Sequence, residues 1–356
     1  MNNFPYLQSL QSLKPNSRIY IYGSGVFGRA FLFSIRAFRP DIQIMGFIDS
    51  FNNGMVLELP VIKVDDFYTV MNNYDNIILC ANPMYWNEMI NNLNENNIEK
   101  YFVNIYWDFD LYGKKDKTKY NKYKHLIHEV QNLLFYEEDK KIWDMITSSM
   151  KIQNIKVLLD YWKKHNKKID YGKYVPLKKG AIVINGGASF GKETHYFARK
   201  VGKQGVIYAF DPKIAKDAQV NNKSIINNPM VLWDQTTKVS FREDNSRSMI
   251  IKRKEENAIE VQATTVDDFV KTSLLKRLDL IKLDVEGAEL NVLRGGEDSI
   301  RKFRPSLAIS IYHKYEHFFQ IPLYINDLVK DYVFHIDCFN PYCVDTILFA
   351  IPIERQ

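Results

Sequence analysis

The sequence contains few cysteines and no pattern that would link them. Cys80, Cys338 and Cys343 are the three cysteines among 356 residues, and none of them forms a CxxC pair. This small, odd number excludes a disulfide framework and argues against a zinc site. No other cluster has clear metal-ligand spacing, so we expect no obligatory metal. The composition suits a reducing compartment, and we expect a cytoplasmic protein.

Long apolar runs are missing as well. The first residues, MNNFPYLQSLQSLKPNS, lack the basic start and apolar centre of a signal peptide. No apolar run reaches the ~18 residues that a membrane-spanning helix needs. These absences predict a soluble chain without a membrane span.

The excess of positive charge is local. The formal net charge is +6, and two lysine-rich segments, Gly113–His125 and Lys163–Lys168, supply it. Such segments can bind an anionic surface, but they are more often a solvated linker and a solvated helix end. No nucleic-acid-binding motif accompanies them, so we expect no nucleic-acid partner.

Strand-like and helix-like segments alternate in two separate series. The first series begins with RIYIYG and VFGRAFLFSIRAF, and the second with AIVING and KETHYFARKV. Alternation of this kind predicts doubly wound, mostly parallel α/β sheets. We therefore predict a Rossmann-like domain over 1–112, a basic linker and helical connector over 113–174, and a second Rossmann-like domain over 175–356. The closing segments YVFHIDCF and DTILFAIPI predict an antiparallel hairpin at the edge of the second sheet.

Each series opens with a glycine-rich turn between a strand and a helix. The first turn contains Gly23, Gly25 and Gly28, a complete G-x-G-x-x-G, and Asp49 ends the next strand. This pattern predicts a nucleotide site resembling that of NAD-binding proteins. The alternative explanation is a tight turn that lets the helix pack closely against the sheet.

The second turn contains Gly186, Gly187 and Gly191, and Asp211 ends the strand that follows. A carboxylate at this position can accept hydrogen bonds from both hydroxyls of a ribose. Downstream, the strand IKLDVEGAEL carries further polar residues, and the terminal hairpin follows. Together these features indicate a methyltransferase that uses S-adenosylmethionine, whose binding loop need not follow G-x-G-x-x-G because the cofactor has no pyrophosphate.

Six segments in a fixed order carry a resemblance to a known family. They are VINGGASFGKET, YAFDP, VQATTVDDF, DLIKLDVEGAELNVLRGG, RPSLAISIYHKYEHFFQIP and DTILFAIP. From about Gln131 to Ala350 the chain resembles the FkbM-type methyltransferases. The resemblance implies a class I methyltransferase fold, S-adenosylmethionine as the methyl donor, and O-methylation of a sugar or another small hydroxylated metabolite.

The same resemblance implies which residues bind the cofactor. They are Asn185, Gly186, Gly187, Ala188, Phe190, Gly191 and Asp211. Asn185 stands where the family usually has Asp, which keeps an acceptor oxygen and removes its charge. His317 stands where the family often has an acidic residue. The first domain resembles the Rossmann-like modules that precede some FkbM-type domains.

Two residues at the ends of neighbouring strands are candidates for catalysis. Asp284 follows the strand LDLIKL, and His313 follows SLAISIY. An unperturbed imidazole has a pKa near neutral pH, so we predict His313 as the general base and Asp284 as its positioning partner. We expect Glu289 to be structural, and Lys192 and Thr194 to be solvated in the first helical turn.

The sequence as a whole predicts an enzyme that methylates a hydroxyl of a sugar, a nucleotide sugar or a glycan-related metabolite, within polysaccharide biosynthesis. Two alternatives stay open. The chain could be an NAD- or nucleotide-sugar-binding protein, or a non-catalytic regulator that binds S-adenosylmethionine. A homo-oligomer is compatible with the sequence, which does not identify the acceptor.

Overall fold

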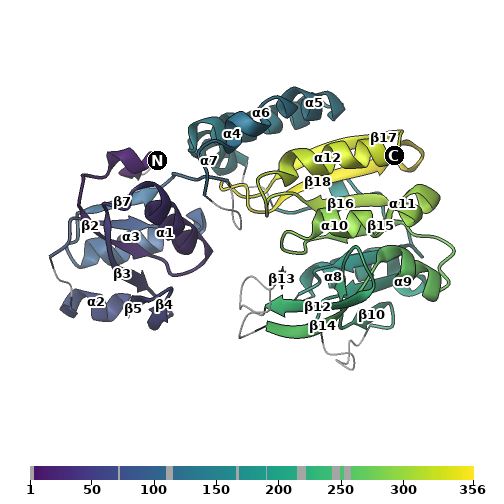
Figure 1. Cartoon of the computed structure of the whole chain (residues 1–356), viewed down its shortest axis with the longest axis horizontal. Coiled ribbons are helices and arrows are strands. Elements are labelled where there is room, and N and C mark those ends of the chain that lie inside the picture. The colour runs from purple at the N-terminus through teal and green to yellow at the C-terminus, as the bar shows by residue number, and fades with distance from the viewer. Residues whose placement is uncertain are drawn as a thin grey trace. The chain divides into compact units, whose positions relative to one another are not determined.

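The computed structural model describes residues 4–70, 73–109, 115–165, 168–189, 191–214, 222–242, 249–251 and 258–356. The chain forms two compact units, each built around a seven-stranded sheet (Figure 1). The first unit contains Met1–Phe109, Lys114–Lys117 and Ser148–Asp160. The second contains Asp110–Gly113, Thr118–Thr147 and Tyr161–Gln356. The connector expected over 113–174 is therefore divided between the two units.

The sheet of the first unit has the order β1-β7-β6-β2-β3-β5-β4 and is parallel except for the β4–β5 pair. Apolar residues such as Ile19 and Ile21 on β2 are fully buried in it. Helix α1 buries Phe31, Leu32 and Ile35, which recur at the spacing of one helical face. The elements are β1 (Tyr6–Leu7), β2 (Arg18–Tyr22), α1 (Val26–Phe38), β3 (Gln43–Asp49), β4 (Gly54–Val56), β5 (Leu59–Lys63), α2 (Val64–Val70), β6 (Asn76–Leu79), α3 (Trp86–Glu95) and β7 (Tyr101–Asn104).

The sheet of the second unit has the order β10-β9-β8-β15-β16-β18-β17. All of its neighbours are parallel except the two pairs that β18 makes, so the predicted antiparallel hairpin closes one edge. The elements are β8 (Ile182–Gly186), α8 (Lys192–Val201), β9 (Val206–Phe210), β10 (Ile225–Asn228), α9 (Val266–Thr272), β15 (Leu280–Leu283), α10 (Glu289–Arg294), α11 (Glu297–Phe303), β16 (Ser306–Ser310), α12 (His317–Leu328), β17 (Tyr332–Cys338) and β18 (Thr346–Pro352). The predicted fold class, two doubly wound α/β domains, is confirmed.

The strands between β10 and α9 form a separate small sheet. Its order is β11-β14-β12-β13, with Phe241 and Ala263 in its buried core. The elements are β11 (Val231–Leu232), β12 (Thr237–Arg242), β13 (Met249–Ile251) and β14 (Ala258–Thr264). Strand propensity alone does not indicate that these strands leave the main sheet.

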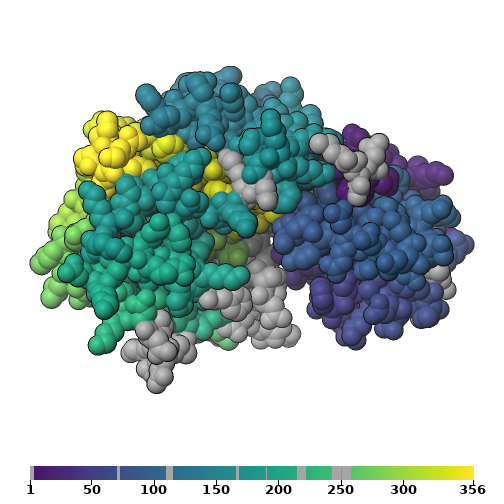
Figure 2. Space-filling model, turned by 180° about the vertical axis from the view of Figure 1, so that it is seen from behind, coloured from purple at the N-terminus to yellow at the C-terminus, as the bar shows by residue number. Residues whose placement is uncertain are grey.

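Four connector helices lie between the two sheets in the sequence: α4 (Lys119–Tyr123), α5 (Leu126–Leu133), α6 (Glu137–Ile152) and α7 (Lys156–His165). Helix α5 packs against α12. Nδ1 of His335 on β17 lies 2.9 Å from Oδ2 of Asp139 on α6. In Figure 1, α5 accordingly runs beside α12, and Figure 2 shows the chain from behind. Helix α5 and the start of α6 thus pack within the second unit.

Two negative findings concern the described residues. None of the helices found there combines the length and the apolar character that crossing a bilayer requires. The three cysteine thiols are free and buried, and no disulfide joins them.

Candidate functional site

Four strands of the second sheet deliver polar residues to one edge. Asn185 lies in β8, Asp211 follows β9, Asp284 follows β15 and His313 follows β16. These strands are neighbours and run parallel, so their carboxyl ends meet. Ligands of open α/β sheets bind at this edge. The structure therefore brings these four residues, which the sequence singled out in the second domain, to one edge.

The second glycine loop lies directly against the end of β15. A Cβ atom added to Gly187 would lie 1.8 Å from the carbonyl oxygen of Asp284, and the φ of Gly187 is +73°. Gly191 caps the start of α8 with a φ of +77°. Ala188 is buried between them, whereas Phe190 lies outside the described residues. Glycine is therefore required at 187 by both sterics and backbone conformation.

The Asp211 carboxylate holds the loop and keeps spare acceptor capacity. The backbone N–H of Ser189 donates to Oδ2 at 2.9 Å, and the N–H of Lys213 donates to Oδ1 at 2.9 Å. An ionised carboxylate has about four acceptor positions. Among the described residues no further donor to Asp211 is found, which leaves one position on each oxygen for a ribose hydroxyl.

The Asp49 carboxylate of the first unit differs from Asp211, because hydrogen bonds within the chain already use its acceptor positions. Oδ2 accepts from the backbone N–H and the hydroxyl of Ser24, at 2.9 and 2.6 Å. Oδ1 accepts from the N–H of Phe51 and from the N–H and side-chain amide of Asn52, at 3.0, 3.0 and 3.2 Å. Burial opposes ionisation, but these hydrogen bonds, first those from Ser24, lower the pKa of Asp49. The donors of its own loops occupy the acceptor positions that a ribose would use.

The glycines of the first loop do not share one role. A Cβ on Gly28 would lie 1.8 Å from the carbonyl oxygen of Gly23, and a Cβ on Gly23 would lie 2.5 Å from that of Cys80. Gly25 has no atom within 4 Å of an added Cβ. Close packing of the turn thus accounts for two of the three glycines, which is the alternative explanation given above.

Asn185 is completely buried beneath the second glycine loop. Its Nδ2 donates to Oγ1 of Thr194 at 2.9 Å, and its Oδ1 has no hydrogen-bond partner in the described part of the chain. Thr194 is itself buried, so the expectation that it is solvated was wrong. An unpartnered buried acceptor is costly, and a ligand that donates a hydrogen bond would relieve that cost.

A buried lysine stands in the middle of the site. Lys282 on β15 forms an ion pair with Glu193 of α8, and its Nζ lies 3.9 Å from Oδ2 of Asp284. Burial opposes its charge, but the attraction of Glu193 and Asp284 raises the pKa of Lys282. The hydroxyl of Tyr171 donates to the other oxygen of Glu193 at 2.6 Å. Lysine is rarely buried unless it is paired in this way.

His313 is surrounded by carboxylates. Its Nδ1 lies 2.7 Å from Oε1 of Glu289, and its Nε2 lies 3.5 Å from Oδ1 of Asp284 and 3.4 Å from Oε2 of Glu286. Burial opposes its charge, but the attraction of Glu289 outweighs it and raises the pKa of His313 to about 9. The imidazole is therefore protonated at neutral pH.

Glu289 lies at the start of α10 and is fully buried. This position is compatible with the structural role that we expected for it. Oε1 also accepts from the N–H groups of Val285 and Gly287, at 3.0 and 3.3 Å, and Nδ1 of His317 lies 3.2 Å from Oε2. Burial raises its pKa, but the two histidines outweigh that effect and hold the pKa of Glu289 well below its usual value. An acidic residue in place of His317 would face Glu289 as a like charge. His317 instead serves as a second partner for Glu289.

Asp284 and Glu286 are the more exposed members of this group, because each side chain is 29% exposed, compared with 1% for His313. The hydroxyl of Tyr312 donates to Oδ1 of Asp284 at 3.3 Å. Asp345, in the turn between β17 and β18, is half-buried and lies close enough for its pKa to respond to Asp284. Burial and then the negative charge of Asp284 raise the pKa of Asp345 to about 6. The edge thus carries more carboxylates than cations, which favours a ligand with positive charge.

Three of these groups also come close enough to share a metal ion. Asp284, Glu289 and His313 each offer one ligand atom, and these atoms lie within 4.8 Å of one another. The Glu289 carboxylate, however, already holds both histidines and two backbone N–H groups. The absence of an obligatory metal stays a prediction.

Sequence reasoning missed Glu193, Lys282 and Asp345. A signal existed for Lys282, because a charged residue inside the apolar strand LIKL must find a partner when the strand is buried. Glu193 and Asp345 gave no such signal. Their positions depend on a helix start and on a hairpin turn that reach the site from distant parts of the sequence.

Comparison with known proteins covers the second unit most clearly. Residues 185–336 match the family model described as the methyltransferase FkbM domain. "Methyltransferase 1" of Beauveria bassiana (strain ARSEF 2860) is 25% identical over 154 residues, which is 35% of this chain and 61% of that protein. The chain thus spans less than two thirds of the length of this curated relative.

One similar solved structure extends over both units. The crystal structure of methyltransferase FkbM from Methylobacillus flagellatus KT has a TM-score of 0.59 and 16% sequence identity. The similarity covers 94% of this chain and 90% of that one. At this level of identity the similarity concerns the fold.

Proposed function

We propose that this chain, a member of the FkbM methyltransferase family through residues 185–336, uses S-adenosylmethionine to methylate an oxygen of a small acceptor. The observation that carries the proposal is the Asp211 carboxylate, which anchors the second glycine loop and still has one acceptor position on each oxygen. The acceptor class we propose is a sugar, a nucleotide sugar or another glycan-related metabolite with a free hydroxyl.

Three features of the site fit this cofactor. Asp211 offers two acceptor positions for a ribose. Asn185 offers a buried oxygen that has no partner among the described residues, suited to a donor from the methionine part. The carboxylates around His313 and Lys282 create a negative edge, and S-adenosylmethionine carries a positive sulfonium. When bound, the cofactor supplies an electrophilic methyl group.

We assign the proton-accepting role to Asp284, which revises the prediction from the sequence. A general base must be able to take a proton, and His313 already holds one because its pKa is about 9. Asp284 is partly exposed at the edge of the sheet, where an acceptor can reach it, and its Oδ1 lies 3.5 Å from Nε2 of His313. As the carbon–oxygen bond forms, the acceptor's hydroxyl proton passes to an oxygen of Asp284.

His313 then acts as a positioning residue. Glu289 holds its Nδ1 at 2.7 Å, which directs Nε2 toward Asp284. Lys282 approaches Asp284 from the sheet side. His313 and Lys282 therefore fix the orientation of the Asp284 carboxylate. This matters because an in-line displacement depends mainly on the alignment of the donor, the acceptor and the groups that hold them.

The test combines binding and turnover. Calorimetry with S-adenosylhomocysteine should show binding to the purified chain. Incubation with labelled S-adenosylmethionine and a panel of sugars and nucleotide sugars should transfer label to an acceptor. Binding without transfer to any hydroxylated acceptor would favour the non-catalytic regulator. No binding of S-adenosylhomocysteine, together with binding of NAD or a nucleotide sugar, would favour the other alternative.

A further inference from the structure

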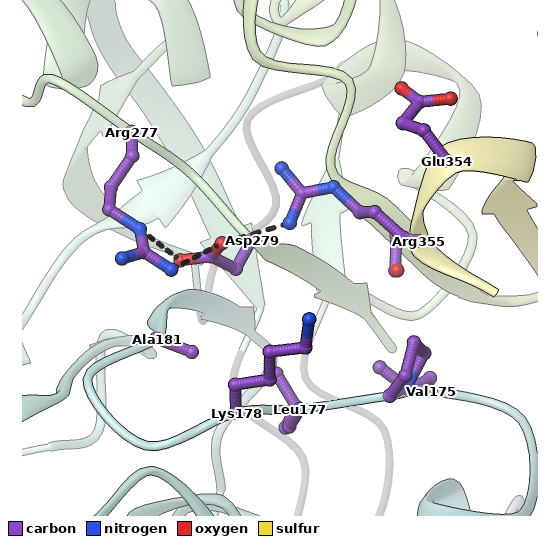
Figure 3. A pocket seen from close by; sticks show the side chains of 10 residues that line it. Val175, Leu177, Lys178, Ala181, Arg277, Asp279, Glu354 and Arg355 are labelled. Atoms are coloured by element: carbon purple, nitrogen blue, oxygen red, sulfur yellow. Dashed lines mark hydrogen bonds and ion pairs between the residues drawn. The ribbon is translucent and has the colours of Figure 1, made fainter.

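The second unit contains a cavity at the edge opposite the proposed active site. Ala181 precedes β8, Asp279 precedes β15 and Ser306 begins β16, so the cavity lies at the amino ends of these strands. Its volume is about 350 Å³. Figure 3 shows the side chains that line it: Val175, Pro176, Leu177, Lys178, Ala181, Arg277, Asp279, Ser306, Glu354 and Arg355.

Two arginines meet on one carboxylate in this cavity. Nε and Nη2 of Arg277 donate to the two oxygens of Asp279, each at 2.8 Å, and Nη1 of Arg355 donates to Oδ1 at 2.8 Å. Burial opposes ionisation of Asp279, but these hydrogen bonds lower its pKa, first those from Arg277. The single negative charge of Asp279 thus fixes the positions of both guanidinium groups, those of Arg277 and Arg355.

The arginines keep donor capacity beyond this contact. A guanidinium carries five N–H donors, and Arg277 uses two of them on Asp279. The Arg277 side chain is 53% exposed, so its outer edge is accessible from solvent. Planar guanidinium groups fixed in this way suit the two oxygens of a carboxylate or phosphate.

A third cation faces the arginines across the cavity. Lys178 is exposed, and in Figure 3 its ammonium extends toward the Asp279–Arg355 pair. The second acidic residue of the lining, Glu354, is engaged elsewhere, because Arg304 donates to Oε1 at 2.6 Å and to Oε2 at 3.2 Å. In Figure 3 its carboxylate points away from Lys178. Three cations therefore surround the single carboxylate of Asp279.

One wall of the cavity is apolar. Val175 is buried, Leu177 is partly buried against the core of this unit, and Ala181 completes the wall. Cavities of about 300–1,000 Å³ with an apolar wall and a few fixed polar groups are typical small-molecule sites. The cavity is large enough for a single-ring molecule with one anionic group.

We propose that this cavity binds a small organic anion, with its carboxylate or phosphate between Arg277 and Lys178 and its apolar body against Val175 and Leu177. The site is distinct from the methyl-donor site. The same strands connect the two sites, but the lining of the cavity shares no residue with the carboxyl edge. A ligand bound here should therefore leave the cofactor's own contacts unoccupied.

Titration calorimetry on the full chain tests the proposal with three single-ring probes. Phenyl phosphate and benzoate carry the anionic groups in question, and benzamide is a neutral match for benzoate. We expect the two anions to bind and benzamide to bind at least tenfold more weakly, because charge-assisted hydrogen bonds are lost. Tighter binding of phenyl phosphate would identify a phosphate monoester as the ligand class, and tighter binding of benzoate a carboxylate.

Two variants locate the binding. Lys178→Gln removes a cation while the Arg277–Asp279–Arg355 contacts stay intact, and it should weaken anion binding roughly tenfold. Arg277→Gln should have a similar effect. Lys276→Gln is the matched control, because Lys276 is exposed beside Arg277 and does not line the cavity. It should leave anion binding unchanged.

Three results would overturn the proposal. One is the absence of anion binding up to about 10 mM. Another is equal weakening by Lys276→Gln and Lys178→Gln, which would indicate general charge attraction. The third is competition between phenyl phosphate and S-adenosylhomocysteine, which would place the anion at the carboxyl edge instead.

Discussion

Oε1 of Glu289 lies 2.7 Å from Nδ1 of His313, and both side chains are withdrawn from solvent. The contact joins the start of α10 to the end of β16, and Asp284 stands on the other side of the imidazole. Two backbone N–H groups fix the Glu289 carboxylate. Its contact with His313 therefore keeps a proton on Nδ1 and directs Nε2 toward Asp284. The chemistry proposed for Asp284 depends on this arrangement.

Removing the carboxylate of Asp284 should affect the rate of methyl transfer most strongly. We expect Asp284→Asn to lower kcat by about 10²–10⁴-fold, the usual cost of losing a general base. His313→Gln should lower kcat by about tenfold to a hundredfold, because it misplaces Asp284 without removing it. Steady-state kinetics with S-adenosylmethionine and an active acceptor measure both effects.

The affinity for S-adenosylhomocysteine is the control in that experiment, and both variants should retain it. If His313→Gln abolished turnover while Asp284→Asn preserved it, His313 would be the base, as the sequence first suggested. If both variants preserved turnover, the reaction would take place elsewhere.

The two glycine loops should respond differently to loss of their aspartates. Asp211→Asn should weaken binding of S-adenosylhomocysteine about tenfold to a hundredfold, because hydrogen bonds to a charged acceptor contribute about 1.5–3 kcal/mol. Asp49→Asn should leave that affinity unchanged. Calorimetry on the two variants measures this difference, and the reverse pattern would assign the methyl donor to the first loop.

Stability should depend on pH through His313. Its pKa is raised from 6.5 to about 9 in the folded chain. The folded state therefore binds more protons between these values, so the free energy of unfolding should fall as pH rises from about 6.5 through about 9. Glu289, Glu286 and Asp284 all face the imidazole and favour its charge. Urea unfolding at a series of pH values measures the effect.

A pair of histidine variants gives that measurement its control. His313→Gln should remove this part of the pH dependence, and His125→Gln, at an exposed position, should leave it as it is. Asp345, with its pKa of about 6, contributes at lower pH, and loss of the His313 charge, which lowers this pKa, should raise it further. An unaltered slope in His313→Gln would show that another group carries the proton.

A methyl group at Gly187 should damage the cofactor loop. The added Cβ would lie 1.8 Å from the Asp284 carbonyl, at a φ that L-residues rarely adopt. We expect Gly187→Ala to cost about 2 kcal/mol or more of stability and to abolish binding of S-adenosylhomocysteine. Gly25→Ala, where an added Cβ meets no atom within 4 Å, should change stability by less than about 0.5 kcal/mol. Thermal unfolding and calorimetry distinguish the two outcomes.

Local patterns were enough to predict the two sheets and the terminal hairpin. Apolar strands followed by glycine turns and amphipathic helices predicted the alternation, and the short polar turn around Asn340 predicted an antiparallel pair. The small β11–β14 sheet was not predicted as a separate sheet, because strand propensity does not say which strand is the partner. The β4–β5 hairpin was missed altogether, because no strand was predicted over residues 54–63.

Only those site residues that directly follow a recognisable apolar strand could be predicted from the sequence. Asp211, Asp284 and His313 each follow an apolar strand, so the topology alone brings them together. Their protonation states were not predictable, because these depend on partners distant in the sequence. His313 was predicted as a base from its ordinary pKa, and the buried Glu289 beside it changes that pKa. The contact of Tyr171 with Glu193 is another example of a partner that the sequence does not indicate.

The carboxylate of Asp49 has a wider consequence for interpreting glycine fingerprints. Ser24 and Asn52 act on it as an internal ligand, making the hydrogen bonds that the diol of a ribose would make. A nucleotide would have to compete with donors that are permanently at their sites and lose no entropy on binding. Recognition can therefore be lost while every glycine and the acidic residue remain. We therefore expect the number of unused acceptor positions on the carboxylate, rather than the spacing of the glycines, to decide whether such a loop binds a nucleotide.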